Sequence, residues 1–415
     1  MTARPNLVEI DGRRLWSTIL RSAEIGPGKK GGLRRLALSD MDKTMRDQFV
    51  AWCREAGCEV SVDRVGSIFA RRKGRDNSLP PVVIGSHLDT QIAGGRYDGV
   101  LGVLAGLEIL RTLNDRGIET ERPVEIVSWT NEEGARFTPA MTASGAFAGV
   151  FTADYALGLK DDDGMSYGEE LRRIGYAGDV PVGGRALDSY FELHIEQGPI
   201  LDRENLPMGI VVKGYTSFGC LVDVFGENAH TAATPMDKRR NALYGASLLV
   251  AAVHAIGWDH HATDGKGNAS RLVCSPNKFG IIPDYAQVAL DVRHPDPATA
   301  AAMFEALKAA IGESAKRANV AMTMVTSWSF GNERFDPDCI ALVKDAAASL
   351  GIPCREMMSQ VGHDAYYISR VAPTALIFTP CKDGISHNEA EHTTLDESVP
   401  GINVLLNAVI ARANR

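Results

Sequence analysis

A chain of 415 residues with 45% hydrophobic and 23% charged residues has the composition of a folded globular protein, and its length predicts two domains. The formal net charge of -8 argues against a nucleic-acid groove, which needs a basic surface to displace counterions from phosphates. No apolar run approaches the ~20 residues that cross a bilayer, and residues 1–15 contain no apolar core of a secretory signal, so we expect a cytoplasmic protein.

The first predicted elements form a βαβ unit. Residues 82–86 (VVIGS) are predicted as a buried strand, residues 98–114 as a helix with one apolar face, and residues 124–130 (VEIVSWT) as a second buried strand. Strand, helix and strand in this order imply a parallel sheet, whose ligands gather beyond the carboxyl ends of the strands. The turns that follow the two strands, residues 87–98 and 131–136, should therefore lie side by side.

A second module interrupts this first domain. Over residues 219–326 the predicted order is strand, helix, two strands, helix and strand, which is the ferredoxin-like βαββαβ pattern. We therefore expect an α/β protein. Its larger domain, with a mixed and largely parallel sheet, should comprise residues 1–212 and 329–415, and the inserted domain should comprise residues 213–328.

Imidazoles and carboxylates collect where the buried strands end. Each histidine taken singly is more often a hydrogen-bonded structural residue than a ligand, and Asp98 alone would favour the role of a helix N-cap. Adjacent carboxylates at one strand end, as in TNEEGARF, are costly unless a cation offsets their charge. Together the candidate ligands are three imidazoles and two carboxylates, at His87, Asp98, Glu133, His194 and His387.

This set of nitrogen and oxygen ligands suits zinc in a catalytic site, with manganese, cobalt or nickel as alternatives. Five ligands exceed the about three that one catalytic zinc takes from protein, but they suffice for two metal ions if Asp98 bridges them. Glu132, next to Glu133, is then left over, and a carboxylate beside an activated water is typical of a general base. Asp89 lies two residues after His87, so we expect Asp89 to accept a hydrogen bond from the imidazole and fix its tautomer.

Four segments together resemble the hydantoinase/carbamoylase family of amidohydrolases: HLDTQ with GGRYDGVLGVLAG, NEEGARF, ELHIEQGPIL and DGISHNEAEHT. This family includes N-carbamoyl-amino-acid hydrolases, beta-ureidopropionase and allantoate amidohydrolase, and it belongs with the aminoacylase-type metallopeptidases. The resemblance covers residues 10–412. It implies a homodimer in which a dinuclear catalytic domain is interrupted by a lid and dimerisation domain. It also implies that His87 and His194 hold one metal ion, that Glu133 and His387 hold the other, and that Asp98 bridges them.

The resemblance also implies residues that bind the substrate. His230, in ENAHTAATPMDKRRNAL, would polarise the scissile carbonyl or stabilise its oxyanion across a dimer interface. Arg293, in LDVRHPDP, would bind a substrate carboxylate, for which its planar fork is suited. Without the family, a surface arginine at a strand end is an equally good interpretation. Gln197 would hydrogen-bond an amide or ureido group, and His363 and Asp364, in VGHDA, would support the pocket.

The sequence departs from the family pattern in the expected substrate shell. Gly280 stands where the family usually carries asparagine, Gln360 and Val361 replace a Gly-Ala pair, and TAATP at residues 231–235 replaces Ala-Gly-Thr-Thr-Pro. The missing asparagine amide removes a hydrogen bond worth about 1 kcal/mol or more. The candidate metal ligands all match, so we expect the chemistry to be retained and the specificity to be altered.

These observations predict a metal-dependent amidohydrolase that cleaves a linear C–N bond in a small carboxylate-bearing substrate, such as N-carbamoyl-beta-alanine or a related ureido acid. Two alternatives stay open. Hydrolysis of an N-acyl amino acid, an aryl amide or a dipeptide is compatible with Gly280 and with Gln360 and Val361. A non-catalytic metal-binding homologue is the other alternative, and the intact Glu132 argues against it because a scaffold needs no base.

Overall fold

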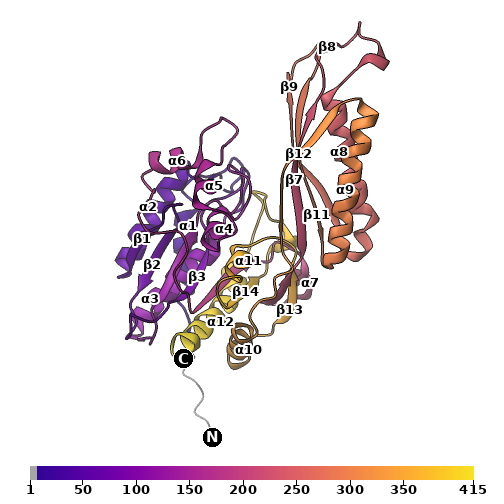
Figure 1. Cartoon of the computed structure of the whole chain (residues 1–415). Helices are drawn as coiled ribbons and strands as arrows, with labels where there is room; N and C mark the ends of the chain where they lie inside the picture. Colours follow the sequence, from indigo (N-terminus) through magenta and orange to yellow (C-terminus); the bar gives the residue numbers. More distant parts are fainter. Residues whose placement is uncertain (1–6) are drawn as a thin grey trace. The chain divides into compact units, whose positions relative to one another are not determined.

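The computed structural model describes residues 7–415 (Figure 1). Residues 1–6, which open the expected first domain and the segment expected to lack a secretory signal, lie outside the described residues. The chain divides into two compact units, one formed by the residues up to Val212 together with Arg334–Arg415, the other by Lys213–Glu333. The role of the second unit as a lid and dimerisation domain stays a prediction.

An eight-stranded sheet forms the centre of the first unit. Its four central strands run parallel, and the strands β1, β2 and β6 pair antiparallel with their neighbours. This confirms the predicted α/β class with a mixed, largely parallel sheet. In order across the sheet the strands are β1 (Glu59–Val62), β2 (Ile68–Arg72), β4 (Val124–Trp129), β3 (Val82–His87), β5 (Ser189–Ile195), β14 (Thr374–Thr379), β6 (Gly209–Gly214) and β13 (Arg355–Ser359).

Several helices of the first unit begin at local capping signals. Ser39 accepts the N–H of Asp42 at the start of α2, and Thr394 and Glu397 form a capping box at the start of α12. The helical elements of this unit are α1 (Gly12–Ser22), α2 (Asp40–Glu55), α3 (Val100–Asp115), α4 (Thr142–Phe147), α5 (Ala153–Gly158), α6 (Tyr167–Arg173), α7 (Ile200–Glu204), α10 (Pro337–Leu350), α11 (Asp364–Ile368), α12 (Leu395–Ala413) and the 3-10 turn η3 (Lys382–Gly384).

The predicted βαβ unit is present as β3, α3 and β4. Every residue of β3 and β4 is buried, as expected for strands that are covered on both faces. The two strands are parallel, with His87 opposite Trp129, so the turns that follow them begin at the same edge of the sheet. The N-cap of α3 is Gly99, with φ of 67° and no side-chain cap, so Asp98 does not serve as the helix cap.

The second unit has the predicted ferredoxin-like order. Its four-stranded sheet has the strand order β12-β7-β11-β9, and each neighbouring pair is antiparallel. Burial alternates along β11, which places every second side chain against the helices. Its elements are β7 (Thr216–Phe225), β8 (Ala229–His230), η1 (Met236–Lys238), α8 (Ala242–Asp259), η2 (His261–Thr263), β9 (Lys266–Ser275), β10 (Ile281–Ile282), β11 (Tyr285–His294), α9 (Pro297–Ala318) and β12 (Ala321–Phe330).

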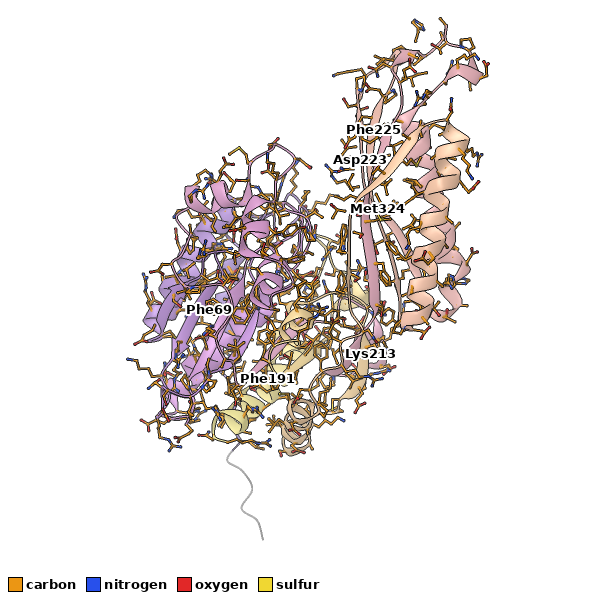
Figure 2. The ribbon with its side chains drawn as sticks, viewed as in Figure 1. Phe69, Phe191, Lys213, Asp223, Phe225 and Met324 are labelled. Atoms are coloured by element: carbon orange, nitrogen blue, oxygen red, sulfur yellow. The ribbon has the colours of Figure 1, made fainter. Side chains whose placement is uncertain are left out.

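Each unit has a hydrophobic core of its own. Phe69 on β2 and Phe191 on β5 are buried in the first unit, whereas Met324 on β12 packs against the core of the second (Figure 2). Among residues 7–415, α8 is the one helix that is long and apolar enough to cross a membrane by length and composition. Its side chains at Leu249 and Val253 are fully buried in the core of the second unit. Packing on a sheet therefore accounts for part of the apolar character of α8, whereas Leu243, Tyr244 and Trp258 on the same helix are exposed.

Candidate metal centre

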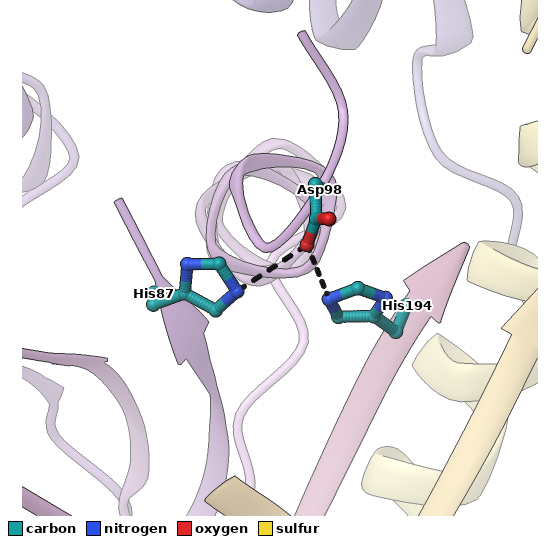
Figure 3. Close-up of side chains that lie close together, drawn as sticks. All are labelled: His87, Asp98 and His194. Atoms are coloured by element: carbon teal, nitrogen blue, oxygen red, sulfur yellow. Dashed lines mark ion pairs between the residues drawn. The ribbon is translucent and has the colours of Figure 1, made fainter. Parts of the chain in front are cut away.

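Two strand ends and one turn bring three predicted ligands together (Figure 3). His87 is the last residue of β3, His194 lies near the end of β5, and Asp98 lies in the turn before α3. Oδ1 of Asp98 is 3.5 Å from Nε2 of His87 and 3.1 Å from Nε2 of His194. All three side chains are buried, and one donor atom from each lies within 4.8 Å of the others, so the group could hold a metal ion.

A second group uses the other oxygen of Asp98. Nε2 of His387 lies 3.5 Å from Oδ2 of Asp98 and 3.2 Å from Oε2 of Glu133. These three residues form the second group that could hold a metal ion. The two carboxylates are buried, whereas the side chain of His387 is 51% exposed. The five predicted ligands thus lie in two groups that share Asp98.

The hydrogen bonds of the buried histidines suit metal binding. Nδ1 of His87 lies 2.9 Å from the carbonyl oxygen of Asp89, and Nδ1 of His194 lies 2.9 Å from the carbonyl oxygen of Ile195. A carbonyl oxygen can only accept, so each Nδ1 carries the proton and each Nε2 presents a lone pair. The N–H of Gly99 donates to Nε2 of His194 at 3.1 Å, which agrees with this tautomer. The residues present therefore fit divalent metal ions.

The electrostatics of the site also favour a cation. Burial alone would lower the pKa of His87, but the carboxylates around it, Glu132 first among them, raise the pKa well above its ordinary value. The same carboxylates crowd one another in a buried place, which is unfavourable unless positive charge is present. A divalent ion in each group would supply that charge.

Asp89 accepts the expected hydrogen bond from His87, but it does so with its backbone carbonyl oxygen. Its buried carboxylate points to the neighbouring turn, where Oδ1 accepts the N–H of Glu132 and Oδ2 accepts the N–H of Glu133, each at 3.3 Å. Asp89 therefore links the imidazole on β3 to the acidic pair after β4. Which oxygen of Asp89 accepts this hydrogen bond depends on the local backbone conformation, which could not be predicted from the sequence.

Glu132 lies beside the first group without being one of its members. Its Oε2 is 3.5 Å from Nε2 of His87, and the residue is only 8% exposed. Burial raises the pKa of Glu132 well above its usual range, and the nearby carboxylates of Asp364 and Glu133 act in the same direction. A carboxylate with a raised pKa at the edge of such a site has the properties of a general base.

Several polar side chains hold the ligand carboxylates, and most of them were not found from the sequence. Gln91 donates from Nε2 to Oε2 of Glu133 at 2.8 Å, and its N–H donates to Oε1 at 3.1 Å. Gln197 donates from Nε2 to Oδ2 of Asp98 at 2.8 Å, while its own Oε1 is buried without a hydrogen-bond partner. Ser386 contacts the same carboxylate oxygen, because its Oγ lies 2.9 Å from Oδ2 of Asp98.

The VGHDA turn lies next to the site. His363 is buried, its ring centroid is 4.5 Å from that of His194, and its Nε2 has no hydrogen-bond partner. Asp364 is fully buried at the start of α11 and accepts a hydrogen bond from the hydroxyl of Ser144. Gln360 and Val361 are partly buried in the turn just before them. The turn thus lies beside His194, and its role as a support of the substrate pocket stays a prediction.

Three predicted substrate residues belong to the second unit. His230 on β8 is exposed and pairs with Ile281, and its Nδ1 accepts the N–H groups of Ala232 at 3.0 Å and Ala233 at 3.2 Å. Its Nε2 is therefore a donor. Gly280 has φ of 92°, and a Cβ at this position would meet nothing within 4 Å. Arg293 on β11 donates from Nε to Oδ1 of Asp291 at 2.9 Å.

Residues 83–411 match the sequence model of Peptidase family M20/M25/M40, and the chain therefore belongs to this family. An N-carbamoyl-L-amino-acid amidohydrolase of Rhizobium meliloti is 42% identical over 404 residues, which cover 97% of each chain. A ureidoglycolate hydrolase of Arabidopsis thaliana is 29% identical, and the match covers 96% of this chain and 86% of that protein. A solved structure of a hydantoinase/carbamoylase family amidase from Burkholderia vietnamiensis has a TM-score of 0.95 and 48% identity, and covers 98% of both chains.

These relatives confirm the resemblance to hydantoinase/carbamoylase amidohydrolases. The protein is a hydrolase that acts on carbon–nitrogen bonds other than peptide bonds. The alternative of a non-catalytic homologue is accordingly not supported.

Proposed function

We propose that the protein hydrolyses the linear C–N bond of an N-carbamoyl amino acid, such as N-carbamoyl-beta-alanine, or of a related ureido acid. The observation that carries this proposal is the pair of ligand groups that share Asp98, with Glu132 beside them. The names of the relatives from Rhizobium meliloti and Arabidopsis thaliana support a carbamoyl or ureido substrate. With a carbamoyl substrate the products would be the free amino acid, carbon dioxide and ammonia.

In this proposal two divalent ions, most simply zinc, occupy the two ligand groups, and manganese, cobalt or nickel are the alternatives. When bound, such ions polarise a carbonyl and lower the pKa of water. Glu132 takes a proton from the attacking water and then returns it to the leaving nitrogen. Its burial and raised pKa support this role, because a base must also be able to act as an acid.

Three polar side chains would take part in holding the substrate. Arg293 would bind the substrate carboxylate in exchange for its present partner Asp291. Nε2 of His230 would donate to the oxyanion that forms during attack. Gln197 would accept an N–H of the ureido group with Oε1, and its support is that this buried oxygen has no other partner.

Hydrolysis of an N-acyl or aryl-amide amino acid is the second candidate function. The observation that favours it is the open space at Gly280, where an added Cβ would meet nothing within 4 Å. A group larger than a carbamoyl amide could use that space. Gln360 and Val361 replace the Gly-Ala pair that is usual in the family, and this replacement would also change the pocket wall beside His363 and Asp364.

We also propose that two copies associate through the second unit. β9 is an edge strand of its sheet, and α8 packs against it. Large apolar side chains are exposed on both elements, namely Leu243, Tyr244, Trp258, Leu272 and Val273. An edge strand can pair antiparallel with the same strand of a second copy, which satisfies its free backbone groups and buries these side chains. Light scattering should then give the mass of a dimer, and a substitution of Leu272 by Glu should give a monomer.

A substrate panel tests the proposed reaction. The purified protein, loaded with zinc or manganese, is assayed with N-carbamoyl-beta-alanine, N-carbamoyl-L-amino acids, ureido acids, N-acetyl amino acids and aryl amides, and ammonia and free amine are measured. We expect ammonia release from a carbamoyl or ureido acid. Turnover of N-acyl or aryl substrates alone would support the second candidate, and no turnover of any member would contradict both.

A further inference from the structure

Glu391 is a buried carboxylate beside the ligand groups that the mechanism above does not use. The residue is 5% exposed and lies in the loop between η3 and α12, four residues after His387. A buried carboxylate is unfavourable unless several donors satisfy it. Its donors therefore indicate what it holds in place.

The carboxylate of Glu391 binds the turn that carries Asp98. Its Oε1 accepts the N–H of Tyr97 at 3.0 Å and the N–H of Asp98 at 3.1 Å. Its Oε2 lies 3.1 Å from Oγ of Ser386, and the same hydroxyl lies 2.9 Å from Oδ2 of Asp98. Glu391 thus holds the backbone of Asp98 directly, and the hydroxyl of Ser386 lies between the two carboxylates, where its one proton can be donated to either of them.

A glycine makes this close approach possible. A Cβ placed on Gly95 would lie 1.9 Å from the carboxylate of Glu391, well inside van der Waals contact. Gly95 does not have a positive φ, so its conformation does not require glycine. The close approach of Glu391 accounts for the residue instead.

His387 depends on the same loop for its position. Its side chain is 51% exposed, and its backbone has φ of 51°, in the left-handed region that is unfavourable for a residue with a Cβ. Ser386 directly precedes it and Glu391 follows it, and both are bound to the Asp98 turn. These contacts fix the loop that presents the exposed imidazole to Asp98 and Glu133.

A purely structural role does not require an acid at this position. A glutamine could accept the N–H groups of Tyr97 and Asp98 with its amide oxygen. A carboxylate adds a negative charge next to Asp98, which is unfavourable in the absence of a cation and favourable in its presence.

We propose that Glu391 is a positioning residue of the metal centre. It holds Asp98 and the loop of His387 in the arrangement that binds a divalent ion between Asp98, Glu133 and His387, and its charge raises the affinity for that ion. This inference rests on the metal centre of the proposed function. It states that Glu391, which is not a ligand, increases the affinity for the ion between Asp98, Glu133 and His387.

Metal titration of the apo protein tests the proposal without an activity assay. Zinc is titrated into wild type and into Glu391→Gln in competition with a chromophoric chelator, and the melting temperature is measured with and without metal. We expect wild type to bind two ions. In the variant, one of the two should bind about 10- to 100-fold more weakly, the range seen when residues that hold metal ligands are changed. The melting temperature of the apo variant should equal or exceed that of apo wild type, so that only the stabilisation by metal decreases.

Two further variants separate positioning from general loosening of the loop. Glu389→Gln is the matched control, because the carboxylate of Glu389 in the same loop accepts the N–H groups of Lys30 and Gly32 rather than that of Asp98. It should bind both ions as wild type does. Gly95→Ala pushes a methyl group against Glu391 and should reproduce the selective loss, even if Glu391→Gln fails to fold.

The possible outcomes are distinct. If Glu391→Gln binds each of the two ions as tightly as wild type does, this inference is overturned and the proposed function is left intact. A loss of the same size in Glu389→Gln, with a lower apo melting temperature in both variants, would also overturn it. Wild type that binds no metal would overturn the proposed function as well.

Discussion

Asp98 faces His194 and His387 with different oxygens: Oδ1 lies 3.1 Å from Nε2 of His194, and Oδ2 lies 3.5 Å from Nε2 of His387. One carboxylate therefore belongs to two ligand groups, and His194 and His387 come to these groups from different parts of the chain. His194 is buried on a strand, whereas His387 is half exposed on a loop. The two halves of the site should respond differently to substitution.

Removal of His387 should cost one metal ion and little stability. His387→Ala deletes a ligand from an exposed side chain, so we expect the metal content to fall from two ions per chain to one with an unchanged melting temperature of the apo protein. His194→Ala also removes one ligand, but it opens a space in a buried region and should lower the apo melting temperature. Elemental analysis and calorimetry of the two variants measure both effects, and identical behaviour of the two would contradict this division.

Glu132→Gln should separate metal binding from turnover. The amide cannot take a proton from water, so turnover should fall by at least ~100-fold, the scale of a lost general base, with the metal content unchanged. Glu119→Gln, an exposed position of the same unit, serves as the control for protein preparation and should retain full activity. Near-normal turnover in Glu132→Gln would exclude Glu132 as the base.

Gly280→Asn should shift the substrate preference. Asparagine tolerates a positive φ better than most residues, and its amide could hydrogen-bond a carbamoyl group. A hydrogen bond worth about 1 kcal/mol corresponds to a roughly 5-fold rise in kcat/KM for a carbamoyl substrate relative to an N-acyl substrate. Gly280→Ala introduces a side chain with the same backbone strain and no amide. If Gly280→Asn and Gly280→Ala change the ratio of kcat/KM between the carbamoyl and N-acyl substrates equally, the amide has no part in recognition.

The stability of the first unit should depend on pH through Asp63, in the turn between β1 and β2. Burial raises the pKa of this carboxyl to about 6, although the N–H groups of Ser67 and Val65 bind it. The folded pKa exceeds the unfolded value of about 3.9, so the stabilisation by this group is complete below pH 4 and is lost as the pH rises to 6. The free energy of unfolding of wild type relative to Asp63→Asn should therefore fall by about 2 kcal/mol between pH 4 and pH 7.

Denaturant unfolding at a series of pH values measures this difference. Asp76→Asn is the matched control, because the exposed carboxylate of Asp76 accepts the N–H of Ser78 in a similar turn and its pKa is lowered rather than raised. The stabilisation that the Asp76 carboxylate contributes should change with pH in the opposite direction, increasing as the pH rises. Parallel pH curves for wild type and Asp63→Asn would contradict the account of Asp63.

The βαβ unit could be predicted from the sequence because its signals are local. Continuous apolar runs predict β3 and β4, and a helical apolar face predicts α3. His87, Glu133 and His194 could be predicted because each ends or closely follows a buried strand, so that parallel pairing brings them to one edge, whereas His387 lies in a loop beyond β14 and η3. The second unit was predicted by the same kind of signal, the order of its strands and helices.

The residues that hold the ligands could not be predicted in this way. Glu391 and Asp98 are 293 positions apart, and nothing in the local pattern of either loop indicates that they meet. The contact between Asp89 and His87 shows a different limit. The sequence indicates that the two residues interact, but the carbonyl makes the contact, because the backbone turns the carboxylate toward Glu132 and Glu133.

Metal content is the most direct test of a site built from two ligand groups that share Asp98. Elemental analysis of the purified protein, followed by anomalous diffraction at the absorption edge of the metal found, should give two ions per chain, one beside His87 and His194 and one beside Glu133 and His387. A protein that stays metal-free after incubation with zinc and manganese, or that binds a single ion away from Asp98, would contradict it.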